Sequence, residues 1–531
     1  MTASHAARSH IKETVISMII AFALAFVFRG FVIEPFQIPT GSMGPTLLGQ
    51  HLQVRDENAG NEWVVAPRDM RRNTAMGEST QGTAGNPLKL KNPLTAQDLP
   101  PTFNQRLRSG DRIFVLKLGA PHRFDAIVFK NPTNPQENYI KRLLGLPGDW
   151  IALIDGDVFA RTPSEADSAD PTHDAPSHDA WNLPGWRCVH KPERIQRSML
   201  QPVFDSQYTP KSGSTFRSPW LPATTSGAGG WDTSTGIYTY SASTPTTLSW
   251  DAARRPLRDY YAYDQTTNAP HDRFPVGDLA MSLGFRPTSP DAALSAVITA
   301  RRHEFRADLT PTSVVLRVRS LDSGDQDAPW TDLAKANLSG ALSPGQVANI
   351  EFWNIDQTLT LFVDGEEIAR AEYAWSPDER VRAATNLGPD WSAIIARDPG
   401  LLTDPDSYFA STVRWEFKGA GPFTLYRVAL ARDVYYQPQL LARDTPARAT
   451  HPITTMRLSP DQFFVCGDNS PYSQDARTWP PNNPWADEID PTRGVVNRKL
   501  LIGKAFVVYF PAPKWKGSIP IPDFGRMRFI W

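Results

Sequence analysis

The sequence has very little cysteine, almost no net charge and a single long apolar run. Cys188 and Cys466 are the only cysteines among 531 residues. Two cysteines exclude a disulfide framework and a zinc knuckle, and they leave open whether one bridge joins them. A formal net charge of −1 creates no field that would gather nucleic acid. We therefore expect no nucleic-acid partner, no metal and no cofactor.

The apolar run near the N-terminus predicts a membrane anchor. Residues 14–28 carry no charge, and reading on to Ile33 gives about 20 residues with Arg29 as the one charge. That length is enough to cross a bilayer core, and a single arginine can extend its charged head to the interface.

The charges on either side of the run predict its orientation. Arg8 and Lys12 precede it, whereas Arg29 and Glu34 cancel after it, so the positive-inside rule places the N-terminus in the cytoplasm. We expect a single-pass protein of the cytoplasmic (inner) membrane, with everything after about residue 33 on the extracytoplasmic side. The alternative is a cleaved secretory signal peptide. Its cleavage-like triplet at 23–25 lies inside the run, which favours a retained anchor.

Strand signals fall into two groups, which predicts one β domain inserted into another. Short apolar runs separated by Pro and Gly turns occur between 112 and 154 and resume after 462. From about 200 to 445 the strands alternate with period two and no helical period is visible, which favours a β-sandwich. Residues 349–370 resemble a hairpin of concanavalin-like, laminin-G-type jelly rolls. Residues 51–108 show few strand signals.

Ser42 lies in a turn-like segment shortly after the anchor, 39–43 (PTGSM). Gly41 permits backbone conformations closed to other residues, so the serine could sit on a tight turn with its hydroxyl exposed. A serine hydroxyl becomes a nucleophile only when a base accepts its proton. Taken alone, Ser42 fits an exposed loop serine equally well.

Lys141 and Arg142 adjoin in a predicted strand, where neighbouring side chains point to opposite faces. We expect one of them to face the interior and the other to face solvent. Full burial lowers the pKa of a lysine by up to about 3–5 units, whereas an arginine cannot be neutralised in this way. Lys141 is the one member of the pair that could act as a base, although an ordinary surface lysine fits the same fragment.

A third segment, 467–477 (GDNSPYSQDAR), follows an apolar strand and is rich in turn formers and polar groups. Such a composition is expected where a loop is held around a site. The alternative is a surface turn closed by a salt bridge between Asp475 and Arg477.

Taken together and in this order behind an anchor, four segments closely resemble motifs of the bacterial type I signal peptidases, serine proteases with a Ser–Lys dyad. The segments are 39–47 (PTGSMGPTL), 123–130 (RFDAIVFK), 139–149 (YIKRLLGLPGD) and 467–477 (GDNSPYSQDAR). This chain departs from the family pattern at Thr40 and Ala476, each in place of a serine, and at Phe124 in place of a glycine. None of these departures touches the nucleophile or the base.

The resemblance implies a role for each matched residue. Ser42 would be the nucleophile and Lys141 the general base. The Thr40 hydroxyl and the Ser42 backbone N–H would form the oxyanion hole. Supporting roles, in which Ser473 orients the lysine amine and an ion pair holds the loop, would fall to Ser473, Asp468, Asp475 and Arg477.

The same resemblance implies that the substrates are secretory preproteins, cut after small residues beside the lipid bilayer. The inserted sandwich would have an unidentified ligand or serve as a structural insert. One alternative is a membrane-tethered glycan- or peptide-binding protein with a vestigial protease, but Ser42, Lys141 and Ser473 are all present. A second is a self-cleaving Ser–Lys protease, which the anchor and the 467–477 loop disfavour.

The predicted fold is therefore mainly β, with one N-terminal transmembrane helix and an antiparallel catalytic β domain interrupted by a jelly-roll-like sandwich. The predicted divisions are 1–33 for the cytoplasmic N-terminus and anchor, 34–160 for the first catalytic part, 161–199 for a linker, 200–445 for the inserted sandwich and 455–531 for the second catalytic part.

Overall fold

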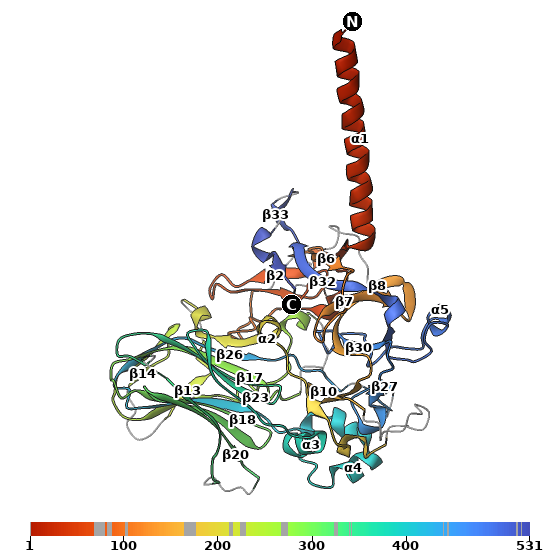
Figure 1. Cartoon of the computed structure of the whole chain (residues 1–531). Helices are drawn as coiled ribbons and strands as arrows, with labels where there is room; N and C mark the ends of the chain where they lie inside the picture. Colours follow the sequence, from red (N-terminus) through yellow and green to blue (C-terminus); the bar gives the residue numbers. More distant parts are fainter. Residues whose placement is uncertain are drawn as a thin grey trace.

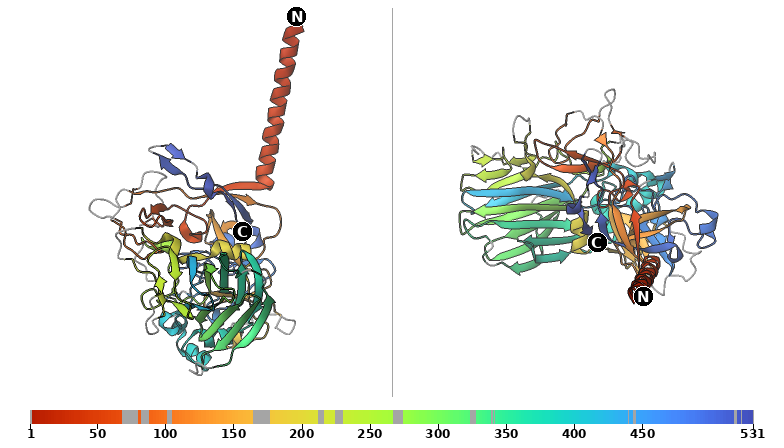
Figure 2. Two further views of the ribbon diagram at one scale, coloured as in Figure 1. Left: turned by 90° about the vertical axis from the view of Figure 1, so that its left-hand side faces the viewer. Right: turned by 90° about the horizontal axis from the view of Figure 1, so that it is seen from above.

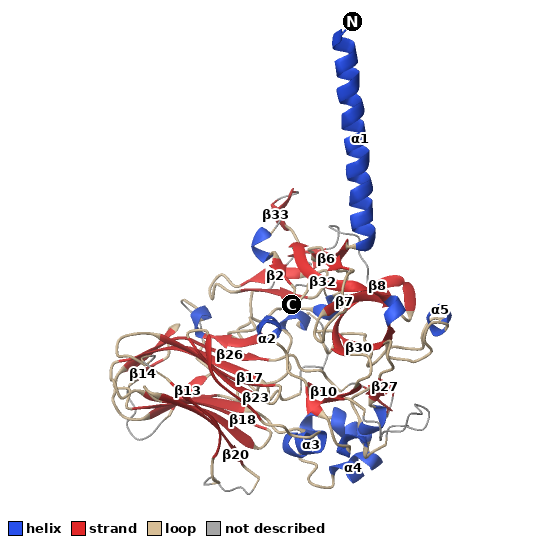
Figure 3. Cartoon of the chain, viewed as in Figure 1, coloured by secondary structure: helices blue, strands red, loops and turns tan. Residues whose placement is uncertain are grey.

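The computed structural model shows two β domains side by side and one long helix standing apart from them (Figure 1, Figure 2). The structure describes residues 2–67, 80–81, 88–100, 105–163, 177–211, 216–223, 230–266, 274–322, 328–338, 340, 342–438, 440–442, 445–516, 519–521 and 523–530. Strands dominate both domains, and the helices other than the first are short (Figure 3). The mainly β fold class is confirmed.

The N-terminal helix α1 (Thr2–Phe31) contains the predicted anchor. Its segment Lys12–Phe31 has a mean hydropathy of 2.1, and none of it is buried in the protein. By length and composition it is a candidate membrane span. The helix ends at Phe31, two residues before the end of the apolar run at Ile33. Ile33 already belongs to the strand β1 (Ile33–Gln37), which pairs with a neighbouring strand.

The first domain, here called the split domain, combines strands from both ends of the chain. Its larger sheet is antiparallel. In spatial order its strands are β1, β6 (Arg112–Leu116), β32 (Leu501–Phe510), β7 (Ala126–Asn131), β8 (Asn134–Gly145), β30 (Gln462–Cys466) and β31 (Val496–Asn497), with β35 (Arg528–Phe529) beside β32. Because β32 lies between β6 and β7, the two ends of the chain fold as one unit.

A smaller sheet completes the split domain. Its strands, in spatial order, are β11 (Arg187–Cys188), β10 (Asp157–Arg161), β9 (Trp150–Ile154) and β29 (Met456–Arg457). Apolar side chains from both sheets share one core, in which Leu143, Ile151 and Phe464 are fully buried. Val434 and Tyr436, from the chain that leaves the second domain, belong to the same core. Part of the chain predicted as insert therefore packs inside the split domain.

The second domain, here called the inserted sandwich, is built from two antiparallel sheets. One sheet runs β14 (Trp231–Asp232), β15 (Ile237–Tyr240), β26 (Phe423–Arg432), β17 (Leu279–Pro287), β22 (Ala348–Ile355), β23 (Thr358–Val363) and β24 (Glu366–Glu372), with β12 (Gln201–Asp205) also beside β26. The other runs β13 (Trp220–Pro222), β16 (Thr246–Trp250), β25 (Thr412–Lys418), β18 (Ala293–Ala300), β19 (His303–Leu309), β20 (Ser313–Ser320) and β21 (Thr331–Asn337). Fully buried side chains such as Trp220, Phe285 and Trp415 fill the space between them.

The alternation predicted for the sandwich strands is present. In β20, Val314 and Leu316 are buried, whereas Val315 and Arg317 are partly exposed. The predicted Asp-Gly turn joins β23 to β24, and both of its residues have positive φ, as a tight hairpin turn requires.

The absence of helices predicted for 200–445 is wrong. α3 (Pro377–Ala384) and α4 (Trp391–Arg397) lie beside the smaller sheet of the split domain, where Val381 and Trp391 join its apolar residues. Both helices are too short to show a helical period. A local signal marks α3, because Ser376 and Glu379 form a capping box.

The segment 51–108 also contains more strand than its composition indicated. β2 (Leu52–Arg55) pairs with β3 (Glu62–Val65), and buried leucines from the same segment cover them. The remaining elements are β4 (Thr80–Gln81), β5 (Gln105–Arg106), α2 (Glu193–Met199), β27 (Leu440–Ala442), β28 (Thr445–Pro446), α5 (Pro484–Asp487), β33 (Lys514–Lys516) and β34 (Ile519–Ile521).

The chain enters and leaves the sandwich at neighbouring positions, because β12 pairs with the end of β26 from Gln201↔Arg432 to Asp205↔Ala429. In the stretch predicted as a linker, residues 164–176 lie outside the described residues, and 187–199 contain β11 and α2. The domain boundaries remain a proposal. Cys188 and Cys466 are both free thiols, which answers the question of a bridge.

Candidate active site

The segment around Ser42 follows directly from β1. Ser42 is the middle residue of the short 3₁₀ helix η1 (Gly41–Met43), and it is half-buried. Met43 is fully buried among apolar residues that include Val128 and Ile140, from β7 and β8. The burial of Met43 fixes the position of the serine. Thr40 precedes the helix, but its side chain does not cap it, so its hydroxyl stays available.

The glycine before Ser42 is required for space and not for an unusual backbone angle. Gly41 is absent from the glycines with positive φ, so the predicted special conformation is not observed. A Cβ at this position would lie 2.5 Å from the hydroxyl oxygen of Tyr263, which comes from the inserted sandwich. A side chain at position 41 would therefore push against the sandwich.

Lys141 lies on β8 and is buried, with 2% of its surface exposed. Burial lowers the pKa of its amine to about 8, although the nearby Asp475 carboxylate opposes the shift. Within the described part of the chain Lys141 forms no ion pair, and the ring centre of Tyr139 lies 5.3 Å from Nζ. A lysine in this setting is partly neutral near neutral pH.

Arg142 is also buried, so the expectation that one member of the Lys–Arg pair faces solvent is wrong. Its guanidinium donates to both carboxylate oxygens of Asp468, at 3.1 and 2.6 Å, and to the carbonyl oxygen of Phe124 at 2.8 Å. Strand alternation separates the two side chains correctly. It did not reveal that protein covers both faces of β8 at this point.

The 467–477 loop is held by a second buried ion pair. Arg477 donates from Nε and Nη2 to the two carboxylate oxygens of Asp475, at 2.9 and 2.8 Å, and both side chains are fully buried. Arg477 also donates to the carbonyl oxygens of Gln437 and Ser470, each at 2.8–2.9 Å. Although burial alone would raise it, the guanidinium holds the pKa of Asp475 below its ordinary value.

Gly467 is the point at which three parts of the site meet. A Cβ at this position would collide with the carbonyl oxygen of Ser42 and with the hydroxyl of Ser473. Its neighbour Cys466 is paired with Arg142, next to Lys141 in β8. Ser42 and Ser473 therefore meet at this glycine, and Lys141 belongs to the neighbouring strand β8. The Ser473 hydroxyl is buried and makes no hydrogen bond among the described residues, so its role in orienting the lysine remains a proposal.

Comparison with known proteins relates two parts of the chain to a family. Residues 11–64 and 101–191 match the family model described as signal peptidase, peptidase S26. The matched residues include Ser42 and Lys141. Because of this similarity, the split domain is called the peptidase domain from here on.

The chain is similar to several proteins named signal peptidase I. It is 32% identical over 136 residues to that of Buchnera aphidicola subsp. Schizaphis graminum, covering 25% of this chain and 29% of that protein. It is 31% identical over 129 residues to that of Pseudomonas fluorescens, covering 24% and 30%. It is 29% identical over 149 residues to that of Rickettsia typhi, covering 28% and 43%. The chain thus spans less than half the length of these relatives.

Solved structures overlap the chain weakly. The carbohydrate binding module CBM66 from Bacillus subtilis has a TM-score of 0.20 at 5% identity, covering 36% of this chain and 85% of that one. Sheep galectin-11 in complex with glycerol has a TM-score of 0.17 at 11% identity, covering 29% and 88%. Overlap at this level gives no argument about a ligand of the sandwich.

Residues of the inserted sandwich contact the nucleophile segment, which the sequence did not indicate. The Asn469 N–H donates to the Ser42 carbonyl oxygen at 3.1 Å. The Asn469 side-chain amide donates to the Gly41 carbonyl oxygen at 3.1 Å and to the Asp264 carboxylate at 3.0 Å. Burial raises the pKa of Asp264 to about 7. Asn469 lies in a recognised motif, but no local pattern marks Tyr263 or Asp264.

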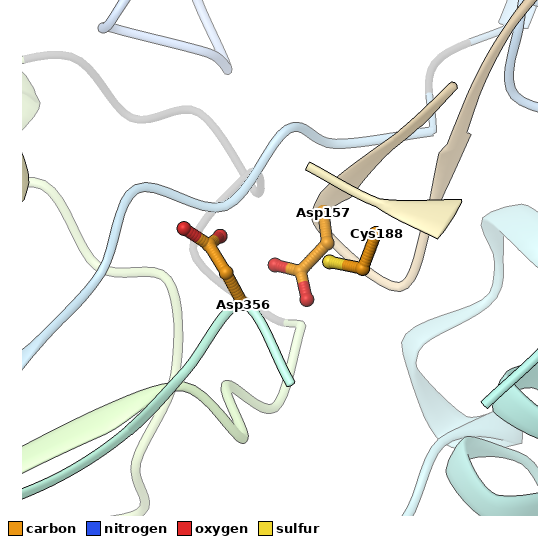
Figure 4. Close-up of side chains that lie close together, drawn as sticks. All are labelled: Asp157, Cys188 and Asp356. Carbon is orange, nitrogen blue, oxygen red and sulfur yellow. The ribbon is translucent and has the colours of Figure 1, made fainter. Parts of the chain in front are cut away.

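One group of side chains at the junction of the two domains has the composition of a metal site. Asp157 on β10, Cys188 on β11 and Asp356 in the turn after β22 point toward one another (Figure 4). Their ligand atoms lie within 4.8 Å of one another, and Asp278 and Asp433 form a similar group with Asp356.

Cations of the chain already occupy these carboxylates. The ion pairs are Lys191–Asp356 at 2.5 Å, Lys191–Asp433 at 2.8 Å, Arg301–Asp278 at 2.6 Å and Arg380–Asp157 at 2.6 Å. Each of these side chains is at least nine-tenths buried. We interpret the group as an ion-pair network that joins the sandwich to the peptidase domain.

Proposed function

We propose that the chain is a membrane-anchored endopeptidase that removes signal peptides from secretory preproteins, with Ser42 as nucleophile and Lys141 as general base. The substrate class follows from the similarity to signal peptidases, and the observation that carries the proposed chemistry is the state of Lys141. Arg142 and Arg477, the other buried cations beside it, each pair with a carboxylate. Lys141 has no such partner among the described residues, and burial brings its pKa to about 8.

In the proposed reaction the Ser42 hydroxyl attacks the scissile carbonyl carbon while the neutral Lys141 amine takes its proton. The resulting ammonium then gives that proton to the leaving amine, which breaks the peptide bond and leaves an acyl ester on Ser42. Water deprotonated by the same amine then attacks the ester, and the ammonium returns that proton to the released Ser42 oxygen. Ser473, which lies beside this site with an unused hydroxyl, would accept a hydrogen bond from the ammonium.

Two donors are available for the developing oxyanion. The Ser42 N–H lies in the first turn of η1, where backbone N–H groups have no partner within the helix. The Thr40 hydroxyl is exposed and unused by the helix, so the threonine keeps the donor that a serine would provide. Removal of one such donor costs about 3–4 kcal/mol of transition-state stabilisation.

The strand edges near Ser42 suit an extended substrate. β1 is the last strand of its sheet, and among the described strands nothing pairs with its outer edge. β30 pairs with β8 only from Arg142 onward, so the edge of β8 at Tyr139 and Lys141 is also unoccupied among these strands. A peptide bound there would gain main-chain hydrogen bonds from these strand edges.

The test uses the full chain in neutral detergent and a fluorogenic peptide with small residues before the cleavage site. We expect Ser42→Ala and Lys141→Ala each to lower kcat/KM by at least about three orders of magnitude, because dyad members act as a unit. Lys130→Ala, an exposed lysine on the neighbouring strand β7, is the matched control and should retain activity. Near-normal turnover by Lys141→Ala would rule out the lysine base.

A further inference from the structure

A cavity of about 860 Å³ lies where the nucleophile segment, the inserted sandwich and the C-terminal end of the chain meet. Pro45 and Leu48, a few residues after Ser42, form one wall, and Tyr263 of the sandwich forms another. Its volume falls in the range of about 300–1,000 Å³ that is usual for small-molecule sites. The cavity is separate from the dyad, whose Ser42 and Lys141 do not line it.

The lining of this cavity is strongly cationic. Six arginines line it: Arg254, Arg255, Arg258, Arg432, Arg526 and Arg528. Lys91 adds a seventh positive charge, and Glu62 is the one carboxylate among the described lining residues. An excess of this size inside a concave, partly apolar site favours an anionic occupant.

Several of these arginines have no carboxylate to neutralise them. Arg255 donates to the carbonyl oxygens of Pro93, Leu94 and Val203, and burial lowers its pKa to about 10. Arg258 forms no ion pair within the described part of the chain and is exposed. A guanidinium has five donors in a planar fork, so those bound to carbonyls keep donors for a carboxylate or phosphate.

The C-terminal arginines also keep donors that no carboxylate uses. Arg528 donates to the carbonyl oxygens of Thr46 and Arg526, and burial lowers its pKa. Arg526 pairs loosely with Asp111, whose carboxylate lies 3.6 Å from Nη2. Its other terminal nitrogen, Nη1, is buried and has no hydrogen-bond partner among the described residues. A buried donor without a partner is costly and marks a place for an acceptor.

Part of the remaining lining is apolar and continues to the surface of the protein. Leu47, Trp63 and Phe529 line the cavity, and Phe529 is 60% exposed. Phe524 and Met527, in the same C-terminal stretch, are 64% and 47% exposed. This stretch follows the β33–β34 hairpin, which projects on the side of the molecule from which α1 rises (Figure 1, Figure 2). An apolar path therefore leads from the cavity toward the side that carries the anchor.

We propose that this cavity binds an amphipathic anion, with a phosphate or carboxylate head held by the arginines and an apolar chain against the apolar wall. Two sources have this chemistry: an anionic lipid of the surrounding bilayer and a free fatty acid or alkyl phosphate. The proposal does not depend on peptidase activity, because it rests on the charge and shape of a cavity outside the dyad.

The experiment is a calorimetric titration of the full chain in phosphatidylcholine nanodiscs. The probes are octyl phosphate and octanoate, with octanol and inorganic phosphate as matched controls for the chain and the head. We expect saturable binding of both amphipathic anions and binding at least about tenfold weaker for each control. Equal binding of octanol, or no saturable binding of either anion, would overturn the proposal.

Two variants locate the site. Arg258→Gln changes an exposed side chain and should fold normally, and Arg255→Gln/Arg258→Gln removes the buried charge as well. We expect the affinity for octyl phosphate to fall about threefold or more in the first and at least about tenfold in the second. Arg382→Gln, an exposed arginine on α3 away from the cavity, is the control. Unchanged affinity in both cavity variants would refute the assignment.

Nanodiscs that contain phosphatidylglycerol distinguish the two sources. If a bilayer lipid enters the cavity, octyl phosphate should no longer bind in these discs, and Arg258→Gln should weaken that competition. If the natural occupant is a free amphiphile, binding should be the same in both kinds of disc. Either result supports the anion site and identifies whether its natural occupant is a bilayer lipid or a free amphiphile.

Discussion

The peptidase domain and the inserted sandwich differ in where their ion pairs lie. In the peptidase domain, complete ion pairs are buried next to Lys141, and Arg142–Asp468 and Arg477–Asp475 have no exposed side-chain surface. The sandwich also has buried ion pairs at its junction with the peptidase domain, such as Arg301–Asp278. Away from the junction its interior is apolar, and its charges form a ladder on the outer face of one sheet. The pairs of this ladder include Arg306–Glu416, Arg414–Glu304 and Arg317–Asp332.

This difference in burial indicates that the ion pairs of the two domains have different roles. A buried ion pair loses hydration on both partners and seldom adds net stability, so its presence beside a site indicates positioning. In the peptidase domain the two pairs neutralise Arg142 and Arg477, whereas Lys141 has no carboxylate partner among the residues that the structure describes. Surface pairs such as those of the sandwich are worth little individually and need no precise geometry.

The largest expected effect tests where one domain ends and the other begins. Deletion of 200–445 removes Val434 and Tyr436 from the peptidase core, together with the Gln437 carbonyl that Arg477 binds. We expect loss of the fold. Deletion of 206–428, with a short turn joining Asp205 to Ala429, keeps the β12–β26 pair and should fold. Thermal melts by circular dichroism compare the two, and equal melting would refute the assignment of 434–437 to the peptidase core.

The next test compares a buried with an exposed pair. Asp475→Asn leaves the buried Arg477 charge without a counterion and should lower the free energy of unfolding by about 3–5 kcal/mol. Asp332→Ala, which removes the partner of Arg317 on the sandwich, should leave the melting temperature nearly unchanged. Chemical denaturation of both variants measures the contrast. Similar losses of unfolding free energy in both variants would show that the buried and the exposed pair contribute equally to stability.

A smaller effect tests the contact between the two domains at the nucleophile. Gly41→Ala places a methyl group against Tyr263 and should displace Ser42, which we expect to lower kcat about 10- to 100-fold. Gly41→Ala/Tyr263→Leu removes the obstructing ring and should recover part of the activity. Tyr426→Leu on β26 in place of Tyr263→Leu is the control. Failure of the double variant to recover would mean that Gly41 acts through something other than this contact.

The last test is the dependence of the rate on pH, which changes gradually and needs no variant. Burial lowers the pKa of Lys141 to about 8, so below pH 8 most molecules carry an ammonium that cannot accept a proton. The neutral fraction falls about tenfold for each pH unit below this value, and kcat/KM should fall with it. Above pH 8 the rate should level off. A rate that does not change between pH 6 and pH 9 would contradict a lysine base.

The sequence predicted what depends on local pattern and on the order of motifs. The strands around Lys141 and before Gly467 are where alternation and turn residues placed them, because those signals are short-range. It did not predict the burial of Arg142, because alternation gives the face of a strand but not what covers it. Nor did it predict Tyr263 beside Gly41, since that contact joins positions more than 200 residues apart and depends on the docking of the sandwich.

The end of α1 has a mechanical consequence. Val32 alone separates the helix from β1, and Lys117 contacts this connection at three points. Its backbone N–H donates to the Val32 carbonyl oxygen at 2.9 Å. Its amine donates to the Gly30 carbonyl oxygen at 3.0 Å and pairs with the Glu34 carboxylate at 2.8 Å. These contacts restrict rotation of α1 relative to the peptidase domain. In a bilayer, the anchored helix would therefore set the distance of Ser42 from the membrane surface.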